Sequence, residues 1–122
     1  MIIDIDNDSF MCDSFEAYEI QVKRIIDLES AEVWISENGG QDDLPSLSIL
    51  INDGEYVINY FGEDGSNYVT VGLEGDEREV PFCNGQYDVA GYQIVSREDA
   101  MIAIPDFFNT HEPSERINWE EL

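Results

Sequence analysis

The sequence has few positive charges and no long apolar run. Only 5 of its 122 residues are lysine or arginine, against 28 aspartates and glutamates, so the formal net charge is −23. No basic patch can form from so few cations, which argues against direct binding to a phosphate backbone or to an anionic membrane surface. No apolar segment approaches the roughly 20 residues that a membrane-spanning helix needs. The acidity instead favours a basic protein partner.

Cysteine and histidine are also scarce. Cys12 and Cys83 are too few for a disulfide framework, and we expect reduced thiols in a cytoplasmic protein. His111 is the only histidine, so a Ser-His-Asp or Cys-His catalytic pair would have to use it. It follows the last predicted helix in a polar segment, and we interpret it as a surface residue. Zinc needs three or four His or Cys ligands at close spacing, which these residues do not provide. We therefore predict no metal, and we also predict no catalytic residue and no cofactor.

The first residues do not resemble a secretion signal, because the apolar Met1-Ile2-Ile3 is followed at once by Asp4, Asp6 and Asp8 and there is no basic region. The run Asp4-Ile5-Asp6-Asn7-Asp8 resembles the start of a calcium loop. Ser9 and Phe15, however, occupy the positions that need glycine and a bidentate glutamate. We therefore interpret this run as a solvated acidic edge. Apolar residues make up 43% of the chain and aromatics 11%, enough for the core of one domain over residues 1–122.

The hydrophobic pattern predicts a helix, a series of strands and a second helix. Asp13 and Glu16 have the spacing of a capping box, and apolar residues at three- and four-residue intervals predict a helix over 14–28. The second helix begins at Ser96, as its N-cap, although Pro105 is unfavourable within it. Predicted strands cover residues 3–6, 31–36, 45–51, 55–61, 68–71, 78–83 and 92–95, with turns at Asp53-Gly54 and Asn84-Gly85.

This order predicts an α+β fold. We expect an antiparallel β-sheet meander of about five to six strands, with an N-terminal and a C-terminal helix packed on one face. The tail over residues 111–122 is expected to be polar apart from Pro113, Ile117, Trp119 and Leu122.

Two loops concentrate the acidic residues. The loops over 62–67 and 72–79 combine glycines with carboxylates. The carboxylates would repel phosphates, so neither loop is a phosphate-binding loop. Solubility requires a net charge of only about 2–8 in a small domain, so the excess suggests binding. In a meander, consecutive loops lie at opposite ends of the sheet, so the two need not be adjacent. We predict that the partner-binding residues are Glu63, Asp64, Tyr68, Glu74, Asp76 and Glu77.

Two stretches resemble the first immunity-protein family of bacterial polymorphic toxin systems. The first comprises Leu44-Pro45-Ser46-Leu47-Ser48-Ile49, Val57-Ile58-Asn59-Tyr60-Phe61 and Tyr68-Val69-Thr70-Val71-Gly72. The second runs from Ala100 to Trp119, with Phe107-Phe108-Asn109-Thr110, Pro113, Ile117 and the end Trp119-Glu120-Glu121-Leu122. His111 stands where the family usually has glycine, and Pro105 within the helix is a second departure.

The resemblance implies an antidote, not an enzyme. Such proteins bind the C-terminal domain of a cognate toxin, which often acts on nucleic acid as a deaminase or nuclease. Tyr60, Phe61, Phe108 and Trp119 would then be core positions. The acidity agrees, because an inhibitor that covers a basic cleft in a 1:1 complex should itself be acidic. The alternative is an acidic DNA-mimic protein that sequesters a DNA-binding protein. A small hydrolase or a calcium-binding module is a third, weaker possibility.

Overall fold

The computed structural model of the chain describes residues 1–6, 8–40 and 42–122. Its helices are α1 (Phe15–Ile25) and α2 (Arg97–Thr110), with a short 3-10 helix η1 (Gly91–Gln93) before α2. The strands are β1 (Ile2–Ile5), β2 (Asp8–Met11), β3 (Ser30–Ser36), β4 (Ser46–Asn52), β5 (Glu55–Phe61), β6 (Asn67–Thr70), β7 (Glu79–Phe82), β8 (Tyr87–Ala90) and β9 (Trp119–Glu121). Neither helix in this described part of the chain is both long and apolar enough to cross a bilayer.

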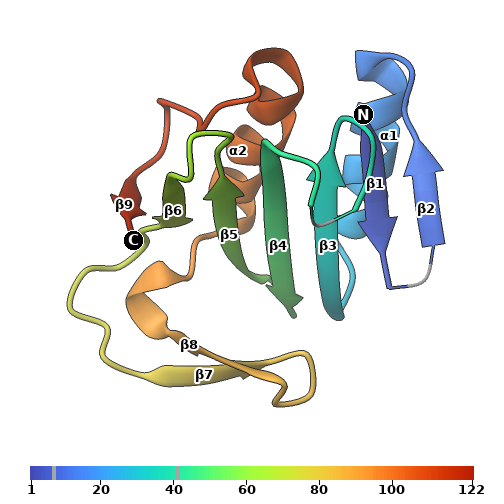
Figure 1. Cartoon of the computed structure of the whole chain (residues 1–122). Helices are drawn as coiled ribbons and strands as arrows, with labels where there is room; N and C mark the ends of the chain where they lie inside the picture. Colours follow the sequence, from blue (N-terminus) through green and yellow to red (C-terminus); the bar gives the residue numbers. More distant parts are fainter. Residues whose placement is uncertain (7, 41) are drawn as a thin grey trace.

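Seven of the strands form one sheet in the order β2-β1-β3-β4-β5-β6-β9, with every neighbouring pair antiparallel (Figure 1). The predicted α+β class and antiparallel sheet are confirmed. The predicted strand count was too low, because β2 and β9 were not expected. The meander extends only from β3 to β6, since β1 lies between β2 and β3 and the chain leaves the sheet after β6. The helices are also not terminal elements: a β-hairpin precedes α1, and β9 follows α2.

The hairpin of β4 and β5 is confirmed where the sequence predicted it. Its two turn residues, Asp53 and Gly54, have φ angles of 43° and 82°. A two-residue turn with positive φ at both central positions has a backbone twist that matches the right-handed twist of the two strands it joins. Asn52 therefore lies opposite Glu55, which fixes the register of the two central strands.

Helix α1 is shorter than predicted and has a different cap. The side chain of Ser14, rather than Asp13, accepts a hydrogen bond from the backbone N–H of Ala17 at 3.2 Å. The helix ends at Ile25, and its last turn contains Lys23 and Arg24, which favourably oppose the helix dipole. Its inward face contains Tyr18, Val22 and Ile25, as the spacing predicted.

Helix α2 begins where the sequence placed it. The Ser96 side chain accepts a hydrogen bond from the N–H of Asp99 at 3.2 Å, which confirms the predicted N-cap. Pro105 lies within the helix, which continues to Thr110. A proline there lacks the N–H that would bond to the carbonyl of Met101, so α2 tolerates one missing backbone bond.

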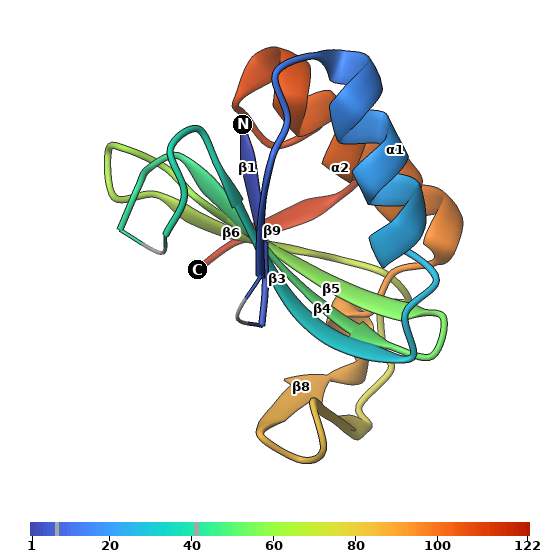
Figure 2. The ribbon, with the colours of Figure 1, turned by 90° about the vertical axis from the view of Figure 1, so that its right-hand side faces the viewer.

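Both helices pack on one face of the sheet, as predicted (Figure 2). Strand residues that face the helices, such as Ile49 and Ile58, are fully buried in one core with Tyr18 of α1 and Phe107 of α2. The Tyr18 hydroxyl donates to the carbonyl of Ile104 at 2.6 Å and so joins the two helices. This core forms the rigid base on which the loops and the tail are placed.

A separate hairpin, β7 and β8, covers part of the opposite face (Figure 2). Phe82 and Val89 pack there against Leu50, Val57 and Val69 of the main sheet. The predicted strand over 78–83 is confirmed as β7 but does not belong to the meander. The predicted strand over 92–95 was wrong: residues 91–93 form η1, and in that range only Val95 pairs with a strand, through a single bridge to Tyr56.

Candidate functional site

The structure separates the predicted site residues into two groups. Glu63 and Asp64 lie in the loop that precedes β6, and Tyr68 lies on β6 itself. Glu74, Asp76 and Glu77 lie in the segment that leaves the opposite end of β6 and leads to the β7–β8 hairpin (Figure 1). The two loops therefore do not form one surface, which agrees with the expectation that consecutive loops need not meet.

Asp76 stabilises its own turn. Its carboxylate accepts hydrogen bonds from the backbone N–H and the guanidinium of Arg78, the shortest at 2.7 Å, and its side chain is only 10% exposed. These bonds lower the pKa of Asp76. The carboxylate also lies where a Cβ on Gly91 would fall, 2.5 Å from Oδ1. Asp76 thus fixes this turn against η1, while Glu74 and Glu77 remain exposed beside it.

The first group lines an open groove of about 840 Å³, with Glu63 and Asp64 on its rim. The groove is on the helix side of the sheet, between the β5–β6 loop and the tail that follows α2. Its apolar lining includes Tyr60, Tyr68, Ile117 and Trp119, which also contact the main core. The rings of Tyr60 and Tyr68 lie 6.2 Å apart at 47° and form an aromatic floor.

Four carboxylates surround this floor, from Glu63, Asp64, Glu112 and Glu115. Burial is the main reason that the pKa of the Tyr60 hydroxyl is raised, and the negative charges of Glu112, Asp64 and Glu63 raise it further. Three carboxylates from two separate segments therefore act on one hydroxyl. Among the described residues, those that line the groove include no lysine or arginine.

Each wall of the groove is held by its own hydrogen bonds. Asp64 accepts from the backbone N–H and the hydroxyl of Ser66, at 3.0 and 2.6 Å, which shapes the β5–β6 loop and lowers the pKa of Asp64. The Tyr60 hydroxyl donates to the carbonyl of His111 at 3.0 Å. That bond joins the floor of the groove to the point where the chain leaves α2.

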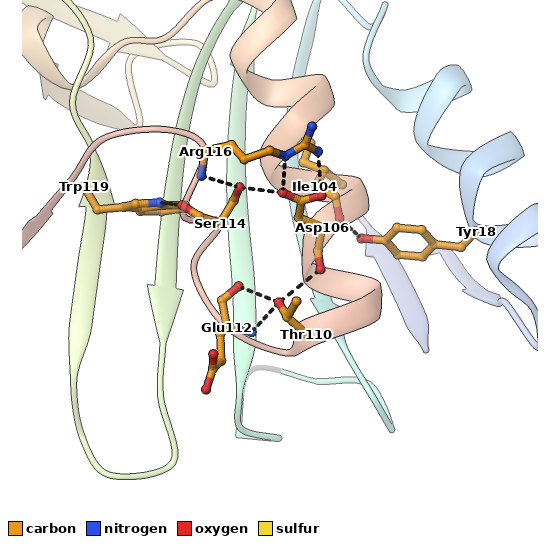
Figure 3. Close-up of polar contacts among 8 residues, drawn as sticks. All are labelled: Tyr18, Ile104, Asp106, Thr110, Glu112, Ser114, Arg116 and Trp119. Atoms are coloured by element: carbon orange, nitrogen blue, oxygen red, sulfur yellow. Dashed lines mark hydrogen bonds and ion pairs between the residues drawn. The ribbon is translucent and has the colours of Figure 1, made fainter.

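The tail is held by Asp106 of α2 (Figure 3). Its carboxylate accepts from the hydroxyl of Ser114 at 2.6 Å and from two guanidinium nitrogens of Arg116 at 2.9 and 2.6 Å. The Trp119 indole N–H then donates to the carbonyl of Ser114 at 2.9 Å. These contacts place Trp119 in the groove. They also hold the Arg116 guanidinium against Asp106 on α2.

His111 ends α2 in the left-handed conformation, with a φ of 56°. Its ring nitrogen Nε2 lies 3.0 Å from the Glu37 carboxylate, and this contact is the main cause of a lowered pKa for Glu37. The position of His111 at the end of the last helix was predicted. Glycine adopts positive φ without steric cost, so it would fit this position better than a residue with a Cβ.

The acidic run near the N-terminus forms the β1–β2 hairpin, and Asn7 within it lies outside the described residues. Asp4 accepts hydrogen bonds from the Ser9 hydroxyl and from the N–H of Gly40, so it links this hairpin to the β3–β4 loop. Over the described ranges, no three His, Cys, Asp or Glu side chains are grouped as a metal site would require.

Sequence reasoning missed the parts of the groove contributed by the tail. Glu112 and Glu115 were not selected, because the segment after α2 was interpreted only as a polar tail. Tyr60 and Trp119 were assigned to the core. Tyr60 is indeed 7% exposed, but Trp119 is half-buried and forms part of the groove wall. The signal was present in the sequence as apolar residues spaced between carboxylates in an otherwise polar segment.

Phe61 corrects another core assignment. Successive strand residues point to opposite faces, so Phe61 lies on the face away from the helices while Tyr60 lies toward them. Its ring stacks on Trp34 at 5.6 Å instead of packing against α2.

Neither a family model nor a curated protein matches this chain.

Proposed function

We propose that this protein is an immunity protein that binds the C-terminal domain of a cognate bacterial toxin and blocks it in the cytoplasm. The observation that supports the proposal best is the groove: an aromatic floor surrounded by four carboxylates, with no lysine or arginine in its described lining. This surface is complementary to a basic, partly apolar protein segment. A toxin domain that acts on nucleic acid presents such segments around its substrate cleft.

The charge of the whole molecule supports the same partner. Lys23, Arg78, Arg97 and Arg116 lie within 4.0 Å of carboxylates of this chain, so four of its five lysines and arginines already have acidic neighbours. The remaining acidic excess gives a field that attracts a basic partner from a distance and speeds association at low salt. Fast capture suits an antidote, because a small number of free toxin molecules can be lethal.

We propose binding and not catalysis. The sequence offers a single histidine, and its ring is engaged with Glu37 at the edge of the groove. The carboxylates of the rim project from a loop and a tail around an aromatic floor, an arrangement suited to holding a cation. A DNA mimic would need carboxylates spaced as two rows of phosphates. The four rim carboxylates of this protein instead gather around one groove, which favours a compact basic segment over a DNA-binding protein that grips a duplex.

The test is stoichiometric inhibition. If our proposal is correct, a toxin gene lies directly before this gene; the C-terminal domain of that toxin is purified, and its activity on DNA and RNA is measured with increasing amounts of the protein. We expect activity to fall linearly and reach zero at one equivalent, with a 1:1 complex on size exclusion. Full toxin activity at a tenfold excess of the folded protein would contradict the proposal.

A further inference from the structure

We infer that the groove accepts the side chain of an arginine, presented by a basic segment of the partner, between its aromatic floor and its carboxylate rim. The inference rests on the proposed function only in assigning that arginine to a toxin. The occupant itself follows from the charge and shape of the groove.

The floor provides the surface of two aromatic rings, tilted at 47° to each other. Tyr60 and Tyr68 lie side by side on neighbouring strands, opposite one another in the register of β5 and β6. Trp119 borders them from β9, where it pairs with Thr70. A guanidinium group is planar and weakly hydrated, so it stacks on such rings, and a cation placed over an aromatic face is attracted electrostatically.

The rim provides paired acceptors. Glu112 and Glu115 lie on the tail and Glu63 on the facing loop, and all three side chains are exposed. Asp64 is held in place by Ser66, so the loop presents its charge in a fixed position. Arginine has five N–H donors in a fixed planar array and can bond to two carboxylates while it stacks, whereas lysine offers a compact, strongly hydrated ammonium.

The chain's own arginine in this region does not fill the groove. The Arg116 guanidinium bonds twice to Asp106 of α2, and Arg116 is not among the lining residues (Figure 3). The volume of about 840 Å³ exceeds that of one side chain and falls within the range of small-molecule sites. It therefore has room for the neighbouring residues of a peptide segment.

Three blocked peptides test the inference without the toxin: Gly-Gly-Arg-Gly-Arg-Gly-Gly and its versions with lysine or citrulline in place of arginine. The protein has two tryptophans, Trp119 in the groove and Trp34 on the opposite face of the sheet, so their indole N–H signals report the two faces separately. We expect the arginine peptide to shift the Trp119 signal and leave that of Trp34 unchanged. It should bind about two- to fivefold tighter than the equally charged lysine peptide, and the neutral citrulline peptide should not bind.

Matched variants locate the site. Glu112→Gln/Glu115→Gln should weaken binding of the arginine peptide at least about fivefold, a loss of about 1 kcal/mol. Glu74→Gln/Glu77→Gln removes the same charge at the other end of β6 and should change binding less than twofold. Tyr68→Leu keeps an apolar floor without the ring and should abolish the preference for arginine over lysine.

Equal affinity for arginine and lysine peptides, absence of binding, or a shift of Trp34 instead of Trp119 would each overturn the inference. The two proposals fail separately. If the arginine peptide binds the groove but the toxin domain is not inhibited, the proposed function is wrong and this inference stands. If the toxin is inhibited equally by wild type and by Glu112→Gln/Glu115→Gln, the function stands and this inference is wrong.

Discussion

Asp106 and Arg116 form the contact that folds the tail back onto α2. The carboxylate of Asp106 accepts from Nε and Nη2 of Arg116 at 2.9 and 2.6 Å, ten residues along the chain. The same carboxylate accepts from Ser114, whose carbonyl receives the indole N–H of Trp119. One acidic side chain therefore organises the wall of the groove and the approach to the edge strand β9.

Replacing that acid should loosen the tail. We expect Asp106→Asn to lower the free energy of unfolding by about 1–2 kcal/mol, because a hydrogen-bonded charge is lost but the guanidinium is largely exposed. Asp27→Asn is the matched control, since Asp27 makes one contact of 3.1 Å to Arg97 and both side chains are exposed. Its cost should be below about 0.5 kcal/mol in urea unfolding. Equal losses in the two variants would show that Asp106 does not hold the tail.

The same pair predicts a pH dependence. Hydrogen bonds from Arg116 lower the pKa of Asp106 below its ordinary value of 3.8. The Asp106 carboxylate therefore binds a proton less readily in the folded protein than in the unfolded chain. The stabilisation by the Asp106–Arg116 pair is complete above the pKa of Asp106 in the unfolded chain, and it is lost as the pH falls through the lower pKa of the folded protein. We expect the difference between wild type and Asp106→Asn to be constant from pH 5 to 7 and to shrink below about pH 4. A difference that grows on acidification would be inconsistent with this sign.

His111 should be replaceable by glycine at little cost. Its φ of 56° is unfavourable for a residue with a Cβ, and its contact with Glu37 is exposed. We expect His111→Gly to be about 1 kcal/mol more stable than His111→Ala, because both lose the ring but only glycine relieves the left-handed conformation. The comparison uses thermal unfolding of the two variants. If they melt together, the helix end does not hold this backbone conformation in solution.

The β7–β8 hairpin should be an integral part of the fold. Phe82 is fully buried against the sheet, so Phe82→Ala should cost about 3–5 kcal/mol. Pro81→Ala, beside it on the exposed side of β7, is the control and should change stability little. Hydrogen exchange should show faster exchange of β7 and β8 amides in Phe82→Ala. A cost below about 1 kcal/mol would mean that the hairpin is not packed against the sheet.

The fold was predictable where local signals agree with the tertiary structure. The Asp53-Gly54 turn, the Ser96 cap and the apolar faces of both helices were assigned from the sequence for that reason. Strand β7 was predicted but assigned to the main sheet, because a strand signal does not say which sheet the strand joins; β8 was missed, and its place was given to a strand over 92–95. Leu50 carried a clue, since it breaks the alternation of β4 and lies in the second core. Strand β9 was not predicted, because a strand of three residues is too short to show a hydrophobic periodicity. Only its pairing with β6 defines it, and Trp119 was therefore expected in an irregular tail.

The site was predictable only in part. Glu63 and Asp64 were selected because charge and glycine gather in one loop, and Tyr68 as an aromatic anchor beside them; the structure places all three at the groove. Glu74 and Glu77 met the same criterion but lie at the opposite end of β6. Local composition cannot distinguish these loops, because the groove is completed by a tail more than 40 residues away in the sequence. The groove is created by the long-range hydrogen bond of Tyr60 with His111 and by the bond of Arg116 to Asp106, which folds the tail back onto α2.

The most direct test is the affinity of the toxin domain that we propose as the partner for two variants that lose the same charge. Glu63→Gln/Glu112→Gln/Glu115→Gln neutralises the rim and spares Asp64, which its loop requires. Glu74→Gln/Glu77→Gln/Asp88→Asn neutralises three exposed carboxylates near the hairpin. At equal salt, we expect the first variant to bind at least about tenfold more weakly than wild type, with most of the change in dissociation rate, and the second within about threefold. Equal affinity of the two variants would contradict a binding site in the groove and place the toxin contact elsewhere on the acidic surface.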